Sequence, residues 1–198
     1  MMKFLAVFFF SAAFALSPET ALKQLMEGNE RYASDLLAHP DRTSERREEL
    51  KAGQTPFATI VGCSDSRVPP EIIFDQGLGD LFIVRDAGNV IGPVEQDSVD
   101  YSAKFLGSSL VVVMGHEACG AIKAVLAGQV SEIEAVAALI QPNVRKNDSV
   151  EAATKSNVRA MVASLRQNPY MKKLIAEKKI DVVGAYYHLG TGRVELLR

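Results

Sequence analysis

The chain has 198 residues, of which 47% are hydrophobic and 23% are charged, and its formal net charge is −2. This length is enough for one domain whose core needs no disulfide bonds. The small net charge argues against general electrostatic attraction to nucleic acid or to acidic lipid. We therefore expect a globular domain that does not bind nucleic acid.

The first sixteen residues differ from the rest of the chain in composition. Lys3 precedes an almost wholly apolar run at residues 4–14, which ends in Ala13-Phe14-Ala15. A basic start, a short apolar run and a small-x-small exit are typical of a secretory signal peptide. The run is shorter than the roughly 20 residues that span a bilayer, although a buried first helix or an uncleaved anchor stays open. We predict a signal peptide at residues 1–16 and a mature domain at 17–198 without a membrane span, exported to the periplasm or, alternatively, secreted or delivered to an organelle lumen.

Two helices are predicted at the start of this domain. Ser17 followed by Pro18 suits a helix start, because serine caps free N–H groups and proline is tolerated in the first turn. Helical spacing of apolar residues continues to Tyr32, with a predicted break at Gly28-Asn29. A second, shorter helix is expected at about residues 43–51. Both helices offer little apolar surface, so we expect them to project from the domain and to pack on a partner subunit.

Four short apolar runs, rich in valine and isoleucine, follow these helices. They lie at residues 57–62, 81–84, 110–114 and 180–186. Continuous apolar runs predict strands covered on both faces, as in a parallel sheet. Helical stretches are expected between them, at about 95–106, at 118–126 and within 131–178, and a final edge strand is expected at residues 193–197. The predicted fold is α/β, a mainly parallel sheet flanked by helices.

Side chains able to bind a metal follow two of these strands. Cys63 and Asp65 come directly after the first predicted strand, and His116 and Cys119 come directly after the third. Because parallel strands end at one edge of a sheet, these four side chains are expected to converge if the strands are neighbours. Thiolate, imidazole and carboxylate together suit Zn²⁺. The sequence therefore predicts one zinc ion per subunit.

Arg67 suggests that the zinc site is catalytic. Four protein ligands close a zinc site, whereas catalysis needs an open position. A carboxylate is the most displaceable of the four ligands, and Arg67 could capture Asp65 in a bidentate ion pair. A non-catalytic zinc-binding module remains an alternative. So does a disulfide or dithiol redox pair between Cys63 and Cys119, although that pairing leaves His116 without a role.

The two motifs, Cys63-Ser64-Asp65-Ser66-Arg67 and Gly115-His116-x-x-Cys119-Gly120, resemble those of the β-class carbonic anhydrases. The resemblance implies zinc-dependent, reversible hydration of carbon dioxide to bicarbonate and a proton, a lyase reaction. It also implies that hydroxide on the zinc is the nucleophile and that an Asp65–Arg67 dyad orients it. Members of the family work as dimers or higher assemblies, so we expect a homodimer or tetramer with the site near an interface. Hydrolysis of carbon disulfide or carbonyl sulfide on the same fold is an alternative.

Further positions of the resemblance concern the substrate and the subtype. It assigns Gln54, Phe82, Ala87 and Gly120 to the substrate site. Members regulated by bicarbonate carry tryptophan where this chain has Ile60, and the chain has no tryptophan. We therefore expect a plant-like, open-site subtype without the regulatory pocket.

Overall fold

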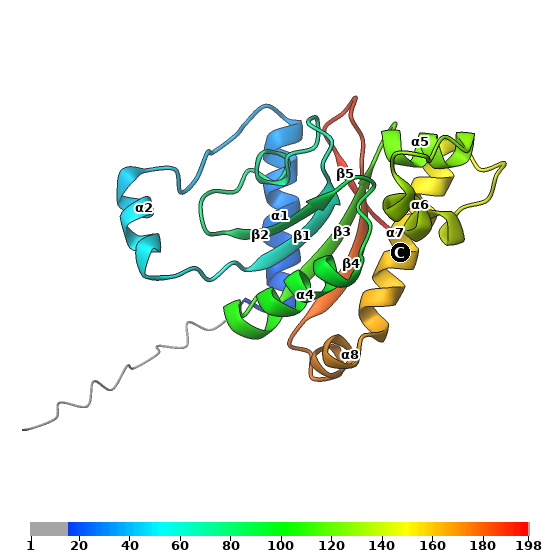
Figure 1. Cartoon of the computed structure of the whole chain (residues 1–198). Coiled ribbons are helices and arrows are strands. Elements are labelled where there is room, and N and C mark those ends of the chain that lie inside the picture. The colour runs from blue at the N-terminus through cyan, green and yellow to red at the C-terminus, as the bar shows by residue number, and fades with distance from the viewer. Residues whose placement is uncertain (1–15, 198) are drawn as a thin grey trace, which may run out of the picture.

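A five-stranded sheet forms the centre of the computed structural model, with strand order β2-β1-β3-β4-β5 (Figure 1). The structure describes residues 16–197, so the predicted signal peptide lies outside the described residues except for its last position. The first four strands pair in parallel, and β5 pairs antiparallel with β4. The strands are β1 (Ala58–Cys63), β2 (Leu81–Asp86), β3 (Leu110–His116), β4 (Asp181–Tyr187) and β5 (Val194–Leu197). The predicted mainly parallel sheet and its edge strand are confirmed.

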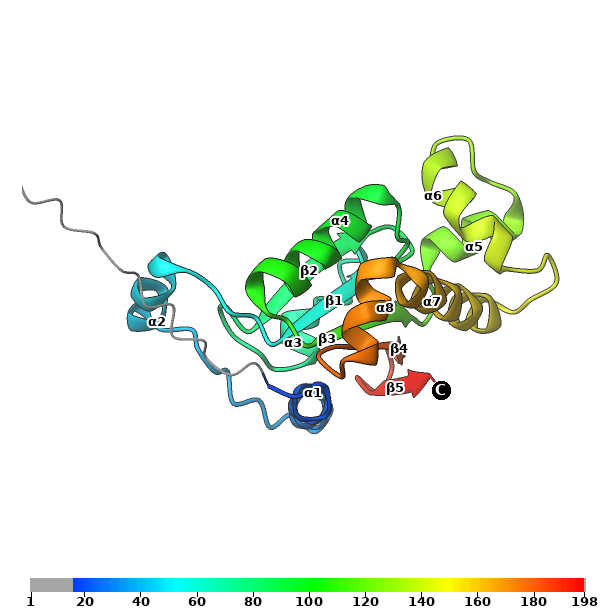
Figure 2. The ribbon, with the colours of Figure 1, turned by 90° about the horizontal axis from the view of Figure 1, so that it is seen from below.

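Helices cover both faces of this sheet. Figure 2 shows α1 on one face and α4, α7 and α8 on the other. The helices are α1 (Pro18–Ala33), α2 (Ser44–Glu49), α3 (Pro70–Ile73), α4 (Pro93–Tyr101), α5 (Gly120–Ala127), α6 (Glu134–Ile140), α7 (Val150–Gln167) and α8 (Pro169–Ala176), with shorter turns at Leu50–Ala52, Ser102–Leu106 and Gln141–Asn143. No helix among the described residues is both long and apolar enough to cross a membrane.

The continuous apolar runs are explained by burial on both faces. In β3, Leu110, Val112 and Met114 join the core that includes α1, while Val111 and Val113 join the core beneath α4, α7 and α8. All seven residues of this strand are buried. Alternate side chains thus enter opposite cores, so neither face of the strand can be polar.

The predicted break in the first helix is wrong. Ser17 caps α1 as expected, and the helix then runs without interruption through Gly28 and Asn29. A side chain at position 28 would overlap the carbonyl oxygen of Phe74. The Asn29 amide donates to the carbonyl of Ile73 at 3.1 Å, and its oxygen accepts from the Val194 N–H at 2.8 Å. Both residues therefore serve close packing of α1.

The expectation that both N-terminal helices project from the domain is also wrong for α1. Ala21 and Leu25 of α1 are fully buried in the main core, so this helix covers the sheet of its own chain. By contrast, α2 has no buried residue and stands apart from the sheet in Figure 1. Only α2 thus keeps the exposed character that was expected.

Candidate metal centre

Cys63, His116 and Cys119 meet at the carboxyl edge of the sheet. Cys63 is the last residue of β1 and His116 the last of β3, and these strands are parallel neighbours. Cys119 occupies the N-cap position of α5, directly after the turn that follows β3. The ligand atoms of the three residues all lie within 4.8 Å of one another, and all three side chains are buried. The predicted convergence of these three residues is therefore found in the fold.

The His116 ring is oriented for metal binding. Its Nδ1 lies 2.9 Å from the carbonyl oxygen of Glu117. Because a carbonyl oxygen can only accept a hydrogen bond, the ring carries its proton on Nδ1. Its Nε2 is buried and has no hydrogen-bond partner in residues 16–197. Buried polar atoms are normally paired, and a zinc ion between Nε2 and the two sulfurs would supply the partner. The donor set therefore fits zinc.

The two cysteines form no disulfide bond, and both are buried. The thiol of Cys119 donates to Cys63, and the Gly88 N–H also donates to the Cys63 sulfur at 3.3 Å. The first of these contacts lowers the pKa of Cys63 well below the usual thiol range. The same contact, together with burial, raises the pKa of Cys119, because a second thiolate beside the first is unfavourable. A bound divalent cation would favour both thiolates.

Asp65 is held by Arg67 beside this cluster. Its Oδ1 accepts from Arg67 Nε at 2.9 Å and from the Arg67 backbone N–H at 3.0 Å, and its Oδ2 accepts from Nη2 at 2.7 Å. This bidentate pairing keeps the pKa of Asp65 well below its usual range. The Asp65 Oδ2 lies 3.9 Å from His116 Nε2. Asp65 thus borders the cluster, while the metal-ligating group found at this place contains only the two cysteines and the histidine.

Arg85 of β2 supports the loop that carries Asp65. Its Nε donates to the carbonyl of Cys63 at 2.9 Å, and its Nη2 donates to the carbonyl of Asp65 at 2.7 Å. These bonds satisfy carbonyl groups that leave the sheet at the end of β1. Arg85 therefore positions both a candidate ligand and the dyad through backbone contacts.

Buried polar atoms without partners are concentrated around the cluster. In the described part of the chain such atoms occur only in Asp86, Asn89 and His116. Burial raises the pKa of Asp86 to about 7. A hydrogen bond from the Val90 N–H lowers this pKa, whereas the negative charges of Glu95 and Cys63 raise it further. A protein tolerates such groups mainly where a function needs them.

The proposed substrate residues fall into two groups. Ala87 directly follows β2, and Gly120 begins α5 next to Cys119 with open space where a side chain would stand. Phe82 pairs instead with Thr59 and so lies about 13 Å along the strand from the cluster end. Gln54 is exposed in a hollow formed with residues of α2 and the 50–53 and 78–79 segments, before β1 begins. One chain therefore brings Ala87 and Gly120 near its cluster but not Gln54 or Phe82.

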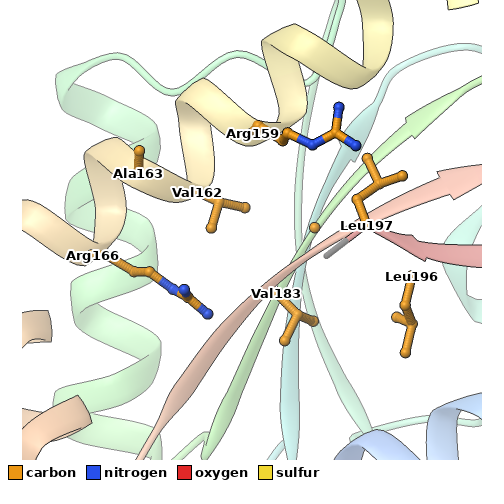
Figure 3. Close-up of a pocket in the computed structure, with 8 residues that line it drawn as sticks. Arg159, Val162, Ala163, Arg166, Val183, Leu196 and Leu197 are labelled. Atoms are coloured by element: carbon orange, nitrogen blue, oxygen red, sulfur yellow. The ribbon is translucent and has the colours of Figure 1, made fainter.

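A separate groove lies between α7 and the strands β4 and β5. Figure 3 shows Arg159 and Arg166 of α7 on either side of Val162, facing Leu197 of β5 and Val183 of β4. The groove has a volume of about 490 Å³, and its lining contains no cysteine, histidine or carboxylate. The groove therefore offers no side chain of the kind that binds zinc.

Known proteins match both the sequence and the fold. A family profile described as carbonic anhydrase matches residues 58–194. The chain is 40% identical over 192 residues to carbonic anhydrase 2 of Mycobacterium tuberculosis. This match covers 91% of this chain and 93% of that relative. The chain belongs to the carbonic anhydrase family. Within this family it falls in the β class, because solved β-carbonic anhydrases share its fold.

Two of those β-carbonic anhydrase structures define the likeness in more detail. The enzyme of Coccomyxa matches with a TM-score of 0.69 and 25% identity, over 89% of this chain and 86% of the other. A tetrameric β-carbonic anhydrase of Sordaria macrospora matches with a TM-score of 0.65 and 24% identity, over 90% and 97%. The likeness thus spans most of this chain and most of each solved structure.

The sequence of this β-class carbonic anhydrase did not reveal the residues that support the candidate metal ligands. The Gly88 N–H reaches the Cys63 sulfur, and the Asn157 side chain on α7 reaches the Gly88 carbonyl. Gly88 adopts a φ of +81°, a conformation that favours glycine. Its place two residues after the end of β2 was a usable signal, whereas nothing local marks Asn157.

Proposed function

We propose that this protein catalyses the reversible hydration of carbon dioxide with one zinc ion bound by Cys63, His116 and Cys119. The observation that carries the proposal is the buried group of two thiols and an unpartnered imidazole nitrogen within 4.8 Å, next to an Asp65–Arg67 ion pair. Membership of the carbonic anhydrase family supports the same reaction.

The residues around the metal have separate roles in this proposal. When bound, zinc would act as a Lewis acid that lowers the pKa of a water molecule towards about 7. Asp65 stays ionised, because Arg67 holds its pKa below the usual range, so it accepts hydrogen bonds and does not store the proton. The Asp65 Oδ2, near His116 Nε2, is the oxygen placed to orient a nucleophile. Ala87 and the open space at Gly120 would border the small apolar substrate.

A catalytic site explains the dyad better than a structural zinc site does. A structural site usually has four protein ligands. Here Arg67 makes three hydrogen bonds to Asp65, which favours three permanent ligands and a fourth position for substrate chemistry. Because Arg67 holds Asp65, the pairing also supports the open-site subtype, in which Asp65 does not close on the zinc.

The experiment is a stopped-flow assay of carbon dioxide hydration on purified protein with its zinc content measured. We expect turnover with about one zinc per chain. Asp65→Asn should keep zinc and lose most turnover, whereas Cys63→Ser should lose zinc. Zinc-loaded protein that hydrates no carbon dioxide contradicts the proposal, and activity on carbonyl sulfide alone would identify the alternative hydrolase.

We further propose that the working unit is a homodimer or a tetramer. The edge strand β2, the end of α4 and the turn at Ser102–Leu106 carry neighbouring aromatic rings. The ring centres of Phe82 and Tyr101 lie 6.1 Å apart, and those of Tyr101 and Phe105 lie 5.3 Å apart. Tyr101 and Phe105 are 47% and 64% exposed, as expected for a surface that a second copy covers. Pairing here would let Gln54 and Phe82 serve the partner's site. Light scattering tests the assembly, and a monomeric active enzyme would contradict it.

Export of the protein is a separate proposal. It rests on the basic start and apolar run of residues 1–16. Ser17 caps α1, so cleavage before it removes no part of the described helices. Expression of the full chain followed by fractionation and N-terminal sequencing tests this. A full-length protein confined to the cytoplasm would contradict it.

A further inference from the structure

A continuous series of hydrogen bonds joins α7 to the Cys63 sulfur. The Asn157 Nδ2 donates to the Gly88 carbonyl at 3.1 Å, and the Gly88 N–H donates to Cys63 Sγ at 3.3 Å. On its other side, the Asn157 oxygen accepts from the Asn143 amide at 3.0 Å. Asn157 is fully buried. Both ends of its amide are therefore occupied, and its only described link towards the cluster passes through Gly88.

Gly88 is held tightly enough to transmit this contact. An added Cβ would come within 2.9 Å of Ile140 Cδ1 on α6 and 3.2 Å of Ala121 Cβ on α5. Three helices thus fix the two peptide groups of Gly88, because α5 and α6 crowd its Cα and α7 holds its carbonyl. The N–H and the carbonyl of Gly88 lie in two peptide planes that are linked through its φ and ψ angles. Glycine itself restrains these angles little at φ +81°, so loss of the contact to the carbonyl would let the N–H turn away from the sulfur.

We propose that Asn157 is a positioning residue of the metal centre, which keeps the Gly88 N–H on the Cys63 sulfur. The proposal rests on the proposed zinc site, but not on the identity of the substrate. A hydrogen bond to a thiolate stabilises its lone-pair electrons and fixes the direction in which it can bind a metal. Contacts of this kind typically change metal affinity by about 10–100-fold.

The test uses the holoprotein and the Asn157→Ala variant. We expect zinc release to a chromophoric chelator to be about 10-fold faster in the variant, because Cys63 is less well oriented. In protein loaded with cobalt(II) as a probe, we expect the sulfur-to-cobalt charge-transfer band to move to lower energy. Loss of the N–H contact leaves more electron density on the sulfur, which explains the direction of the shift.

Two further variants separate positioning from general destabilisation. Asn143→Ala removes the outer contact of the series. It should change the rate of zinc release and the position of the cobalt band in the same direction as Asn157→Ala, but less. If Asn157→Ala fails to fold, Asn143→Ala takes its place in the test. Leu165→Ala opens a cavity in the buried part of α7 away from this series and should lower stability with an unshifted cobalt band.

The outcomes distinguish this proposal from the zinc site itself. Wild-type protein that binds neither zinc nor cobalt overturns the proposed function. A wild type that binds zinc and hydrates carbon dioxide, with an unshifted band in Asn157→Ala and Asn143→Ala, overturns only the role of Asn157. Equal acceleration of zinc release in Asn157→Ala and Leu165→Ala would also overturn it, since the effect would then follow stability.

Discussion

Arg67 binds both carboxylate oxygens of Asp65, with Nε at 2.9 Å from Oδ1 and Nη2 at 2.7 Å from Oδ2. A planar guanidinium matches a carboxylate in this way, whereas an ammonium group cannot. The pair lies beside the three buried candidate metal ligands and directs one carboxylate oxygen towards His116. Its geometry assigns Asp65 the role of Arg67's partner, and its role as a fourth zinc ligand stays a prediction.

Substitution of Arg67 tests the value of this geometry. We expect Arg67→Ala to lower kcat/KM by about 100-fold or more, a loss typical of removing a positioned polar contact in an active site. Arg67→Lys should retain part of the activity, because lysine keeps the charge but not the bidentate contact. Zinc content, measured by atomic absorption, should stay near one per chain. Wild-type rates in Arg67→Ala would contradict the role of the pair.

Removal of zinc should expose the cysteines to oxidation. Their ligand atoms lie within 4.8 Å of each other, and the low pKa of Cys63 favours its reactive thiolate form. We expect chelator-treated protein to lose both thiols to a mild two-electron oxidant such as diamide, with formation of one intramolecular disulfide. Zinc-loaded protein should keep both thiols, as counted by thiol titration after unfolding.

Cys63→Ser provides the control for this oxidation. It leaves one thiol at the site, so an intramolecular disulfide cannot form. Equal oxidation rates with and without zinc would show that the metal does not protect the pair. For an exported enzyme, this result would bear directly on the order of metal loading and oxidation.

The cluster of candidate metal ligands could be predicted from the sequence, because its residues lie at or just after the ends of predicted strands. Cys63 and His116 each follow an apolar run, and adjacent parallel strands bring such positions to one edge. The alternation of β3 between two cores likewise follows from its composition. Only the neighbouring placement of β1 and β3 had to be assumed.

Other features depend on contacts between distant segments, which no local pattern reveals. The helix break was predicted from the propensities of Gly28 and Asn29, yet tertiary contacts to α3 and β5 override them. In the same way, Asn157 is one polar residue on a helix until Gly88 is placed against it. The distance of Gln54 and Phe82 from the cluster also appears only once the strand register is known.

Gly28 offers a direct test of tertiary packing against helix propensity. In an isolated helix, Gly28→Ala would stabilise the helical state by about 1 kcal/mol. In this fold we expect it to destabilise the protein by about 2–4 kcal/mol, because the added methyl overlaps the Phe74 carbonyl. Urea unfolding measures the difference. Gly190→Ala is the control, since nothing lies within 4 Å of its added Cβ and its effect should be below about 0.5 kcal/mol.

Asp75 should make stability depend on acid pH. Its carboxylate accepts from Arg31 Nε at 2.7 Å and from the N–H groups of Ala38 at 2.9 Å and His39 at 3.0 Å. Burial alone would raise the pKa of Asp75, but these hydrogen bonds outweigh it, and the pKa is lowered. The ionised carboxylate therefore stabilises the folded state at pH values above the unfolded pKa of about 4, and this contribution is lost as the pH falls through the folded pKa.

Asp75→Asn tests this dependence, because it keeps the size of the side chain but replaces one acceptor by a donor. We expect a loss of about 2 kcal/mol at pH 7, since the new amide N–H, at a fully buried position, faces donors instead of an acceptor. Urea unfolding at pH 7, 5 and 3 should show a constant difference between wild type and variant at the first two values and a smaller one at pH 3. Asp35→Asn, at an exposed position, should have little effect at any of them. An undiminished difference at pH 3 would mean that the Asp75 contacts act through shape and not through charge.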